Sequence, residues 1–99
     1  MKRISEIKVD RKFLRKWLRK IDEIILALFI GEKVLKCSLL TLQEIMNILI
    51  WILQLDPDLK STRNHVIELV KAGKVIELEG KYKLSKDLLE ELDKIILEG

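Results

Sequence analysis

Residues 41–85, TLQEIMNILIWILQLDPDLKSTRNHVIELVKAGKVIELEGKYKLS, contain a series of signals that start and stop secondary structure. Thr41 and, three residues later, Glu44 match a capping box, in which each side chain satisfies a free amide at the start of a helix. The proline at position 57 disfavours helical backbone at Asp56. We therefore predict a helix over about residues 41–55.

A second helix follows after a short turn. We predict it over residues 59–72, with Asp58 or Ser61 as its N-terminal cap. Gly73 supplies the left-handed residue that closes many helices, so the second helix is expected to end there.

The residues beyond Gly73 predict a two-stranded hairpin. Apolar and polar side chains alternate over 74–78 and 82–84, and Glu79-Gly80 between them are turn residues. The apolar side chains of both strands share one face if Leu78 lies opposite Tyr82. The loop then has three residues, although the common three-residue loop prefers Gly at its last position. The sequence therefore leaves the register open.

This order of helix, turn, helix and hairpin resembles the winged helix-turn-helix family over about residues 34–85. The resemblance implies a mostly α-helical fold with a small β-hairpin wing. The chain adds one predicted helix before the motif, at about 10–30, and one after it, at about 86–97. In this family the start of the second motif helix, here residues 59–72, enters the major groove of duplex DNA.

The resemblance places the candidate DNA contacts on the second motif helix and the wing. Arg63 suits guanine, Asn64 suits adenine, and Ser61 suits a phosphate. The alternative is an ordinary polar helix face on which the lone histidine is structural. Glu77 and Glu79 in the wing oppose a phosphate backbone. The full candidate set on this helix and wing is Lys60, Ser61, Arg63, Asn64, His65, Lys81 and Lys83.

The positive charge of the chain is concentrated at its N-terminus. The net charge is +3, yet residues 1–20 hold nine Lys or Arg against two acids. Residues 1–9 form either a flexible basic arm or a short strand, and Asp10 then caps the first helix. Bases recur along that helix at four-residue spacing, in two rows on one side. A solvated face is one interpretation, and the other is a phosphate-facing surface with Arg11, Arg15 and Arg19 as contacts.

Two predicted helices carry more apolar surface than one small core needs. Residues 24–30, IILALFI, are apolar on all sides, and so are most positions over 45–55. We expect Gly31 to end the first of these helices and a strand to follow near 34–38. The predicted core centres on the motif helices, at Ile48, Leu49, Trp51, Val66, Leu69 and Val70. We further expect a homodimer, or a complex with a larger protein partner, through the first and last helices.

Composition excludes several classes of protein. With one cysteine, Cys37, and one histidine, the chain is expected to have neither a disulfide nor a metal site. It contains no Gly-rich phosphate loop, HExxH or CxxC motif, so we expect neither an enzyme nor a cofactor. The apolar runs are too short to span a bilayer. No signal peptide is evident and the charged residues are mostly Lys and Glu, so we expect a cytoplasmic protein of thermophilic character.

Two functions from different classes follow from the sequence. The first is a small transcription regulator, a single winged-helix domain over residues 1–99 that binds duplex DNA. The second is a protein-binding winged helix that serves as an accessory subunit of an archaeal-type DNA replication or transcription complex. The basic first helix and Arg63-Asn64 favour DNA, whereas the acidic residues of the wing and the excess apolar helix surface favour a protein partner.

Overall fold

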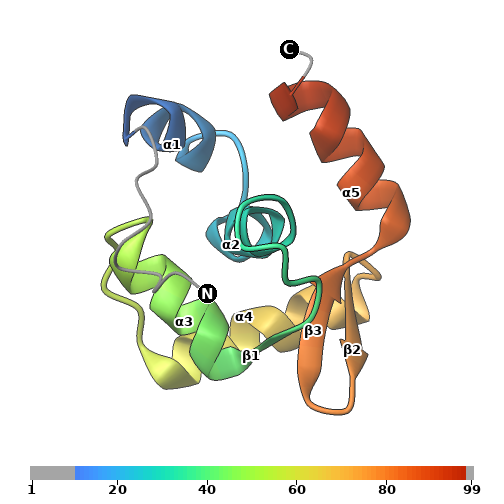
Figure 1. The fold of residues 1–99 in the computed structure, drawn as a ribbon. Helices are drawn as coiled ribbons and strands as arrows, with labels where there is room; N and C mark the ends of the chain where they lie inside the picture. Colours follow the sequence, from blue (N-terminus) through green and yellow to red (C-terminus); the bar gives the residue numbers. More distant parts are fainter. Residues whose placement is uncertain (1–10, 98–99) are drawn as a thin grey trace.

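The central helix of the structure, α2 (Glu23–Lys33), is buried along residues 24–30, and the other elements pack around it. The computed structural model describes residues 11–97 of the chain. The elements besides α2 are α1 (Arg11–Leu18), β1 (Leu40–Thr41), α3 (Leu42–Trp51), α4 (Leu59–Lys71), β2 (Val75–Leu78), β3 (Lys81–Leu84), α5 (Lys86–Leu92) and a π-helical continuation, η2 (Asp93–Leu97). Over the described residues the chain is thus a mostly α-helical domain with one small antiparallel sheet (Figure 1).

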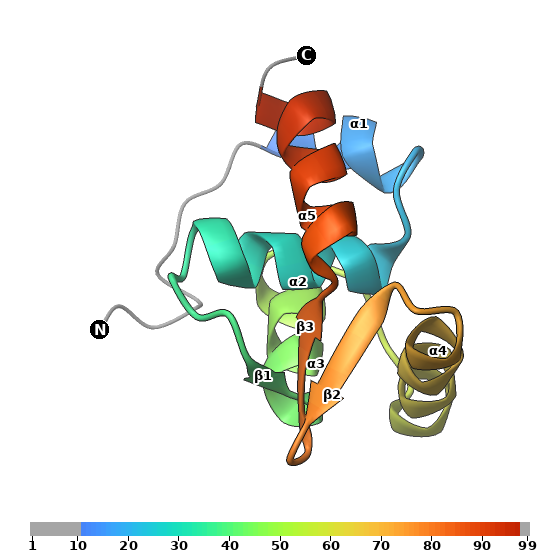
Figure 2. The ribbon, with the colours of Figure 1, turned by 90° about the vertical axis from the view of Figure 1, so that its right-hand side faces the viewer.

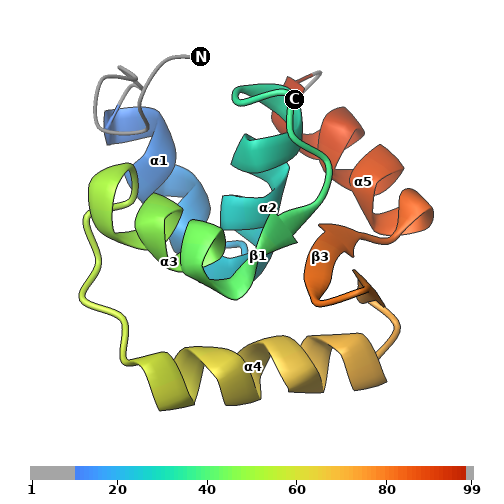
Figure 3. The same cartoon turned by 60° about the horizontal axis from the view of Figure 1, so that its bottom comes forward.

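The helices lie on different sides of α2. α1 and α5 lie towards one end of the molecule, whereas α3, α4 and the hairpin of β2 and β3 lie towards the other (Figures 1 and 2). α2 contacts both α1 and α4 and lies between them. A third view shows α4 crossing the end of the molecule that is remote from α1 (Figure 3).

The starts of α3 and α4 rest on local side-chain contacts that the sequence predicted. The Thr41 hydroxyl accepts from the Glu44 amide at 3.2 Å, and the Glu44 carboxylate accepts from the Thr41 amide at 2.9 Å. This is a complete capping box, and the predicted start of the helix is confirmed. For α4 the cap is Asp58, whose carboxylate accepts from the Ser61 amide at 2.9 Å.

The end of α4 is also formed by a predicted residue, and the start of α5 by a serine cap. Gly73 has a left-handed backbone, with φ of 77°, and the Lys74 amide that follows donates to the Leu69 carbonyl at 3.0 Å. This is the geometry of a glycine-closed helix. The Ser85 hydroxyl accepts from the Leu88 amide at 3.3 Å and caps α5.

The prediction of one continuous helix over 10–30 is wrong, because α1 ends at Leu18 and α2 begins only after Asp22. The Asp22 carboxylate accepts from the amides of Ile24 and Ile25, at 2.8 and 3.3 Å, and so caps a new helix. Apolar residues keep their helical spacing across the break, which is why the pattern predicted one helix. The predicted arm over 1–9 and the cap at position 10 lie outside the described residues.

Gly31 does not end this helix either, since it lies buried inside α2. A Cβ at Gly31 would come within 2.5 Å of the Leu40 side chain, so the missing side chain makes room for Leu40. The chain after Lys33 is a loop with φ of 57° at Lys36, and the strand predicted near 34–38 is therefore wrong. Strand β1 begins only at Leu40 and pairs with β3, which gives the sheet order β1-β3-β2.

The hairpin has a two-residue loop instead of the three-residue loop considered above. Leu78 pairs with Lys81, and Tyr82 pairs with Glu77. The two loop residues, Glu79 and Gly80, have φ of 51° and 78°. Positive φ at both positions is the backbone of a type I′ turn, whose twist matches that of the paired strands.

This register changes which side chains of the hairpin face the core. Val75 and Leu84 are buried, whereas Ile76 and Leu78 are 37% and 46% exposed on the outer face. The shared face of Ile76 and Leu78 with Leu84, which the three-residue loop would have produced, does not form, because a shift of one residue moves a strand's side chains to the opposite face.

The core agrees with the sequence at most positions but not at Trp51. Ile48, Leu49, Val66 and Leu69 are buried, and Val70 packs against them. Trp51 was predicted to be central but is 58% exposed, at the last turn of α3. The helix ends there and not near residue 55, so the outer face of its last turn stays in solvent.

Candidate nucleic-acid interface

The outward face of α4 carries several of the predicted DNA contacts. α4 buries Thr62, Val66 and Leu69, which repeat at helical spacing and fix its inner face. The opposite side of the helix is exposed and forms one stripe, which consists of Lys60, Arg63, Asn64, Ile67 and Lys71. The structure therefore brings Lys60, Arg63 and Asn64 together on a surface that faces away from the core.

The side chains of this stripe have the donors that recognition of base edges requires. A guanidinium such as that of Arg63 donates two parallel hydrogen bonds to the acceptors of guanine. The amide of Asn64 offers one donor and one acceptor, which matches adenine. Lys60 and Lys71 are compact charges at the two ends of the stripe.

Ser61 and His65 lie beside the stripe and line a hollow of about 400 Å³. The hollow also has three carboxylates in its lining, from Glu23, Asp56 and Asp58. These acids repel a phosphate that approaches the first turn of α4 from this side. Ser61 is therefore placed at the border between a basic stripe and an acidic hollow.

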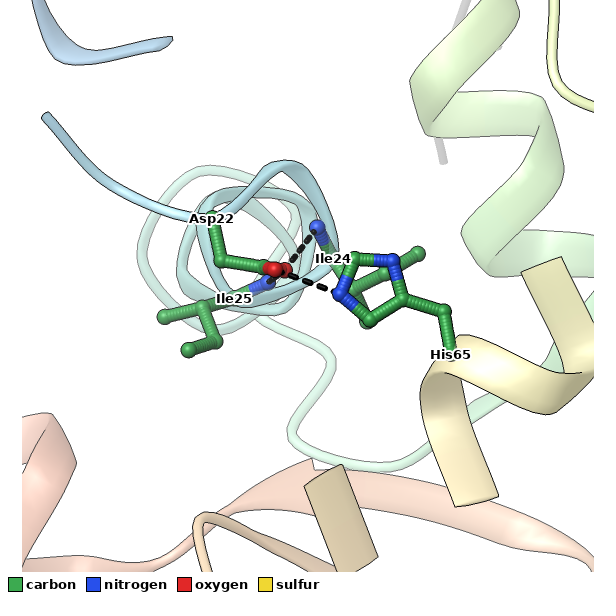
Figure 4. A network of polar contacts seen from close by, with 4 residues as sticks. All are labelled: Asp22, Ile24, Ile25 and His65. Carbon is green, nitrogen blue, oxygen red and sulfur yellow. Dashed lines mark hydrogen bonds and ion pairs between the residues drawn. The ribbon is translucent and has the colours of Figure 1, made fainter. Parts of the chain in front are cut away.

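A single carboxylate joins the start of α2 to α4. Asp22 Oδ1 caps α2, and Asp22 Oδ2 lies 2.5 Å from Nε2 of His65 (Figure 4). The two side chains are 29% and 35% exposed, so the contact is only partly shielded from water. With Nε2 engaged, Nδ1 is the ring nitrogen left for a contact of His65 with DNA, which stays a prediction.

The hairpin adds two lysines and a polar cluster next to α4. Lys81 is exposed and Lys83 is half-buried, and both lie on the outer face of β3 opposite Leu78 and Ile76. The inner face instead carries Tyr82 paired with Glu77. The two predicted wing contacts are therefore on one face, separated from the acidic side chain of Glu77.

The Tyr82 hydroxyl links the hairpin electrostatically to α4. Burial, followed by the charge of Glu77 and a hydrogen bond to it, raises the pKa of Tyr82 above its ordinary value of 10.0, and Arg63 acts in the opposite direction. Arg63 is therefore close enough to interact with this pair.

The predicted contacts on α1 lie apart from those on α4. Arg15 and Arg19 are exposed and line a hollow of about 380 Å³ together with Lys12, Lys16 and Lys20. Arg11 is the first residue of α1, and its side chain lies outside what the structure describes. The structure thus divides the predicted DNA contacts into two groups on separate surfaces.

The sequence prediction missed two features of these surfaces. It described the lysines of the first helix only as part of two basic rows, although Lys12, Lys16 and Lys20 line the same hollow as Arg15 and Arg19. It also missed the contact between Asp22 and His65, which joins residues 43 positions apart. The four-residue spacing of the bases could have revealed the first feature, but no local pattern reveals the second.

Two further kinds of feature are absent from residues 11–97, the part of the chain that the structure describes. No cluster of three or more His, Cys, Asp or Glu side chains in this part of the chain could hold a metal ion. None of its helices is long and apolar enough to cross a membrane.

The chain matches no protein-family model, and no curated protein or solved structure is significantly similar to it. Its function therefore has to be argued from its own residues and geometry.

Proposed function

We propose that this chain is a winged helix-turn-helix protein that binds duplex DNA, most simply as a small transcription regulator. The observation that carries the proposal is the exposed stripe on α4, which includes Lys60, Arg63 and Asn64. The hairpin that follows α4 in the chain bears further lysines. The succession of α3, α4, β2 and β3, with β1 paired to β3, supports the resemblance to the winged helix-turn-helix family.

The dimensions and charge of this region support a DNA ligand. A helix of 13 residues such as α4 is about 20 Å long, and the major groove of DNA admits an α-helix. Residues 59–84 carry six Lys or Arg against three acids. This excess favours a polyanion, because binding of each phosphate releases condensed counterions.

The proposal assigns a role to each predicted contact near α4. Arg63 pairs with guanine and Asn64 with adenine in the major groove. Lys60 contacts a phosphate at the edge of the groove, and Lys81 and Lys83 contact the backbone alongside. Ser61 and Nδ1 of His65 contact phosphates from the side of the basic stripe, away from the carboxylates of the acidic hollow. The proposal includes neither a catalytic step nor a cofactor.

Fluorescence anisotropy with labelled duplexes, in about 50 and 200 mM salt, tests the proposal. Lys60→Ala should weaken binding to all sequences alike and lower the salt slope by roughly one. Arg63→Ala should instead reduce discrimination at one base pair by roughly 1–3 kcal/mol, because a bidentate contact is lost. The matched control is Lys94→Ala, which removes an exposed charge from η2 and should leave binding unchanged.

Two results would overturn the DNA function. One is a wild-type protein that binds no duplex in the lower salt. The other is equal loss of affinity from Lys60→Ala, Arg63→Ala and Lys94→Ala, since that would reflect total charge and not a binding surface.

The exposed Trp51 favours the second candidate function, a protein-binding winged helix that acts as an accessory subunit of an archaeal-type replication or transcription complex. Trp51 and its neighbour Ile50 are 58% and 39% exposed, and Leu59 at the start of α4 is 49% exposed. Tryptophan is enriched at the centres of protein interfaces. Under this function Arg63→Ala leaves DNA affinity unchanged, so the same anisotropy series separates the two candidates.

A further inference from the structure

We propose that the basic hollow on α1 binds the phosphate backbone of a second DNA segment, so that one copy of this chain bridges two duplexes. The inference rests on the proposed function, in which α4 and the hairpin hold the first duplex. The two basic surfaces are far apart and face different directions, and this separation carries the inference.

α1 separates its apolar and basic residues onto opposite sides. Leu14 and Trp17 are buried against the rest of the molecule, at 4% and 6% exposure. The opposite side of the helix, together with the two residues after it, exposes the five cations that line the hollow: Lys12, Arg15, Lys16, Arg19 and Lys20. Because the inner side of α1 packs on α2, these cations point away from the centre of the molecule.

The basic residues of α4 are exposed at the opposite end of the molecule from those of α1. The inner side of α4 contacts α2, and the exposed stripe that includes Lys60, Arg63 and Asn64 lies on the outer side of α4. α1 and α4 lie at different ends of the molecule in all three views (Figures 1, 2 and 3). A straight duplex that fills the surface at α4 therefore cannot also reach the hollow on α1.

The two arginines of the hollow lack an acidic partner within residues 11–97. Arg15 and Arg19 make no ion pair with any described residue. Lys16 and Lys20 lie over the Trp17 ring, 5.2 and 5.7 Å from its centroid, and a contact of this kind does not neutralise their charges. Like charges at three- and four-residue spacing repel one another, so a polyanion that binds here would remove an existing repulsion.

The lining of the hollow favours a phosphate backbone over an acidic protein surface. All five of its residues are Lys or Arg, with no aromatic or aliphatic residue among them. Protein interfaces usually have an apolar centre into which anchor side chains insert, whereas the apolar surface in this hollow is that of the methylene stems of its Lys and Arg side chains. A phosphate backbone requires only regularly spaced charge, which successive turns of a basic helix provide about every 6 Å.

The test is a capture experiment with the full chain. One duplex is fixed to beads, protein is added in about 50 mM salt, and retention of a second, fluorescent duplex is measured. Wild-type protein should retain the second duplex. Arg15→Ala with Arg19→Ala should reduce retention by at least about tenfold, while anisotropy still shows binding of one duplex. The control pair Lys86→Ala with Lys94→Ala removes two exposed lysines from α5 and η2 and should retain the second duplex as the wild type does.

The outcomes separate this inference from the proposed function. Wild-type protein that binds a single duplex but retains no second one overturns the bridging inference and leaves the proposed function intact. No binding of any duplex overturns the proposed function itself. Undiminished retention by the Arg15 and Arg19 variant overturns the inference, because a second copy's α4 would then form the bridge. Displacement of the second duplex by polyglutamate at lower concentration than by competitor DNA also overturns it, in favour of an acidic protein partner.

Discussion

The inner side of α4 depends on Leu69, which is 8% exposed and belongs to the core. Leu69→Ala should lower the free energy of unfolding by about 2–5 kcal/mol, because it removes buried methyl groups and leaves a cavity. Ile67→Ala, on the exposed face at 40%, is the matched control and should cost less than about 1 kcal/mol. Urea titration measures both values. A loss below about 1 kcal/mol for Leu69→Ala would mean that α4 is rotated from the orientation described.

Tyr82 gives the protein a defined response to alkaline pH. Because its pKa is raised in the folded state, the unfolded chain loses this proton first. The contribution of Tyr82 to stability is therefore fully present below about pH 10 and is lost as the pH rises through the folded-state pKa. Tyr82→Phe has no proton to lose at this position, so its stability should decline less at high pH. Thermal denaturation of both proteins between about pH 9 and 11 measures the difference, and equal declines would contradict the prediction.

Single residues of the core and of the surface were predictable to different degrees. Ile48 and Val66 recur at helical spacing on faces that must be buried, and the sequence alone identified them. Trp51 lies on a helix that is apolar nearly all round, so its burial depends on where neighbouring elements end. His65 was predicted to contact DNA, and no local pattern indicated that Asp22 lies against it.

At the scale of the elements, the turn of the hairpin offers a test by stabilisation. Glu79 has φ of 51°, a left-handed backbone that costs a residue with a β-carbon about 1 kcal/mol or more. Asn tolerates this conformation, and Asn-Gly is the preferred pair in a type I′ turn. Glu79→Asn should therefore raise the free energy of unfolding by roughly 0.5–1 kcal/mol. Gly80→Ala, at φ of 78°, should lower it, and a stabilising Gly80→Ala would show that the turn differs from the one described.

Elements whose boundaries depend on local contacts were predictable from the sequence. The Thr41 and Glu44 capping box and the closure at Gly73 each involve residues within one turn of the boundary. The ends of α2 were not predictable in this way. Gly31 stays helical because it makes room for Leu40, and Asp22 interrupts an apolar periodicity that continues across it. Contacts of this kind outweigh the local preference of the chain.

At the scale of the whole molecule, apolar side chains that remain exposed on the terminal helices bear on its assembly. Phe13 on α1 and Ile95 on η2 are 38% and 42% exposed. We predict a homodimer, or a complex with a larger protein, that covers these side chains. If the chain forms a homodimer, light scattering at micromolar concentration should give the mass of two chains for the wild type. The double variant Phe13→Ser with Ile95→Ser should then give the mass of one chain. A dimer that instead dissociates on Trp51→Ser would place the interface on α3, and a wild-type monomer would exclude the homodimer.

The sequence indicated both basic surfaces but not their relation in space. Charge rows identify the exposed side of α1, and the motif resemblance identifies the start of α4. Nothing in either pattern specifies that α2 packs between the two helices, because that arrangement depends on contacts between elements distant in the chain. The sequence therefore did not indicate whether the candidate contacts on α1 and α4 share one surface, whereas the structure places the two helices at different ends of the molecule.

We expect the Asp22 carboxylate to make hydrogen exchange at the start of α2 sensitive to events on α4. Its Oδ1 accepts from the amides of Ile24 and Ile25, while its Oδ2 holds His65. Any ligand that draws His65 away removes one of the restraints on this carboxylate. The two amides should then exchange with solvent faster, although neither belongs to α4, since exchange reports the local opening of a hydrogen bond. The exchange rates of the Ile24 and Ile25 amides should thus depend on a side chain 43 positions beyond Asp22 in the chain.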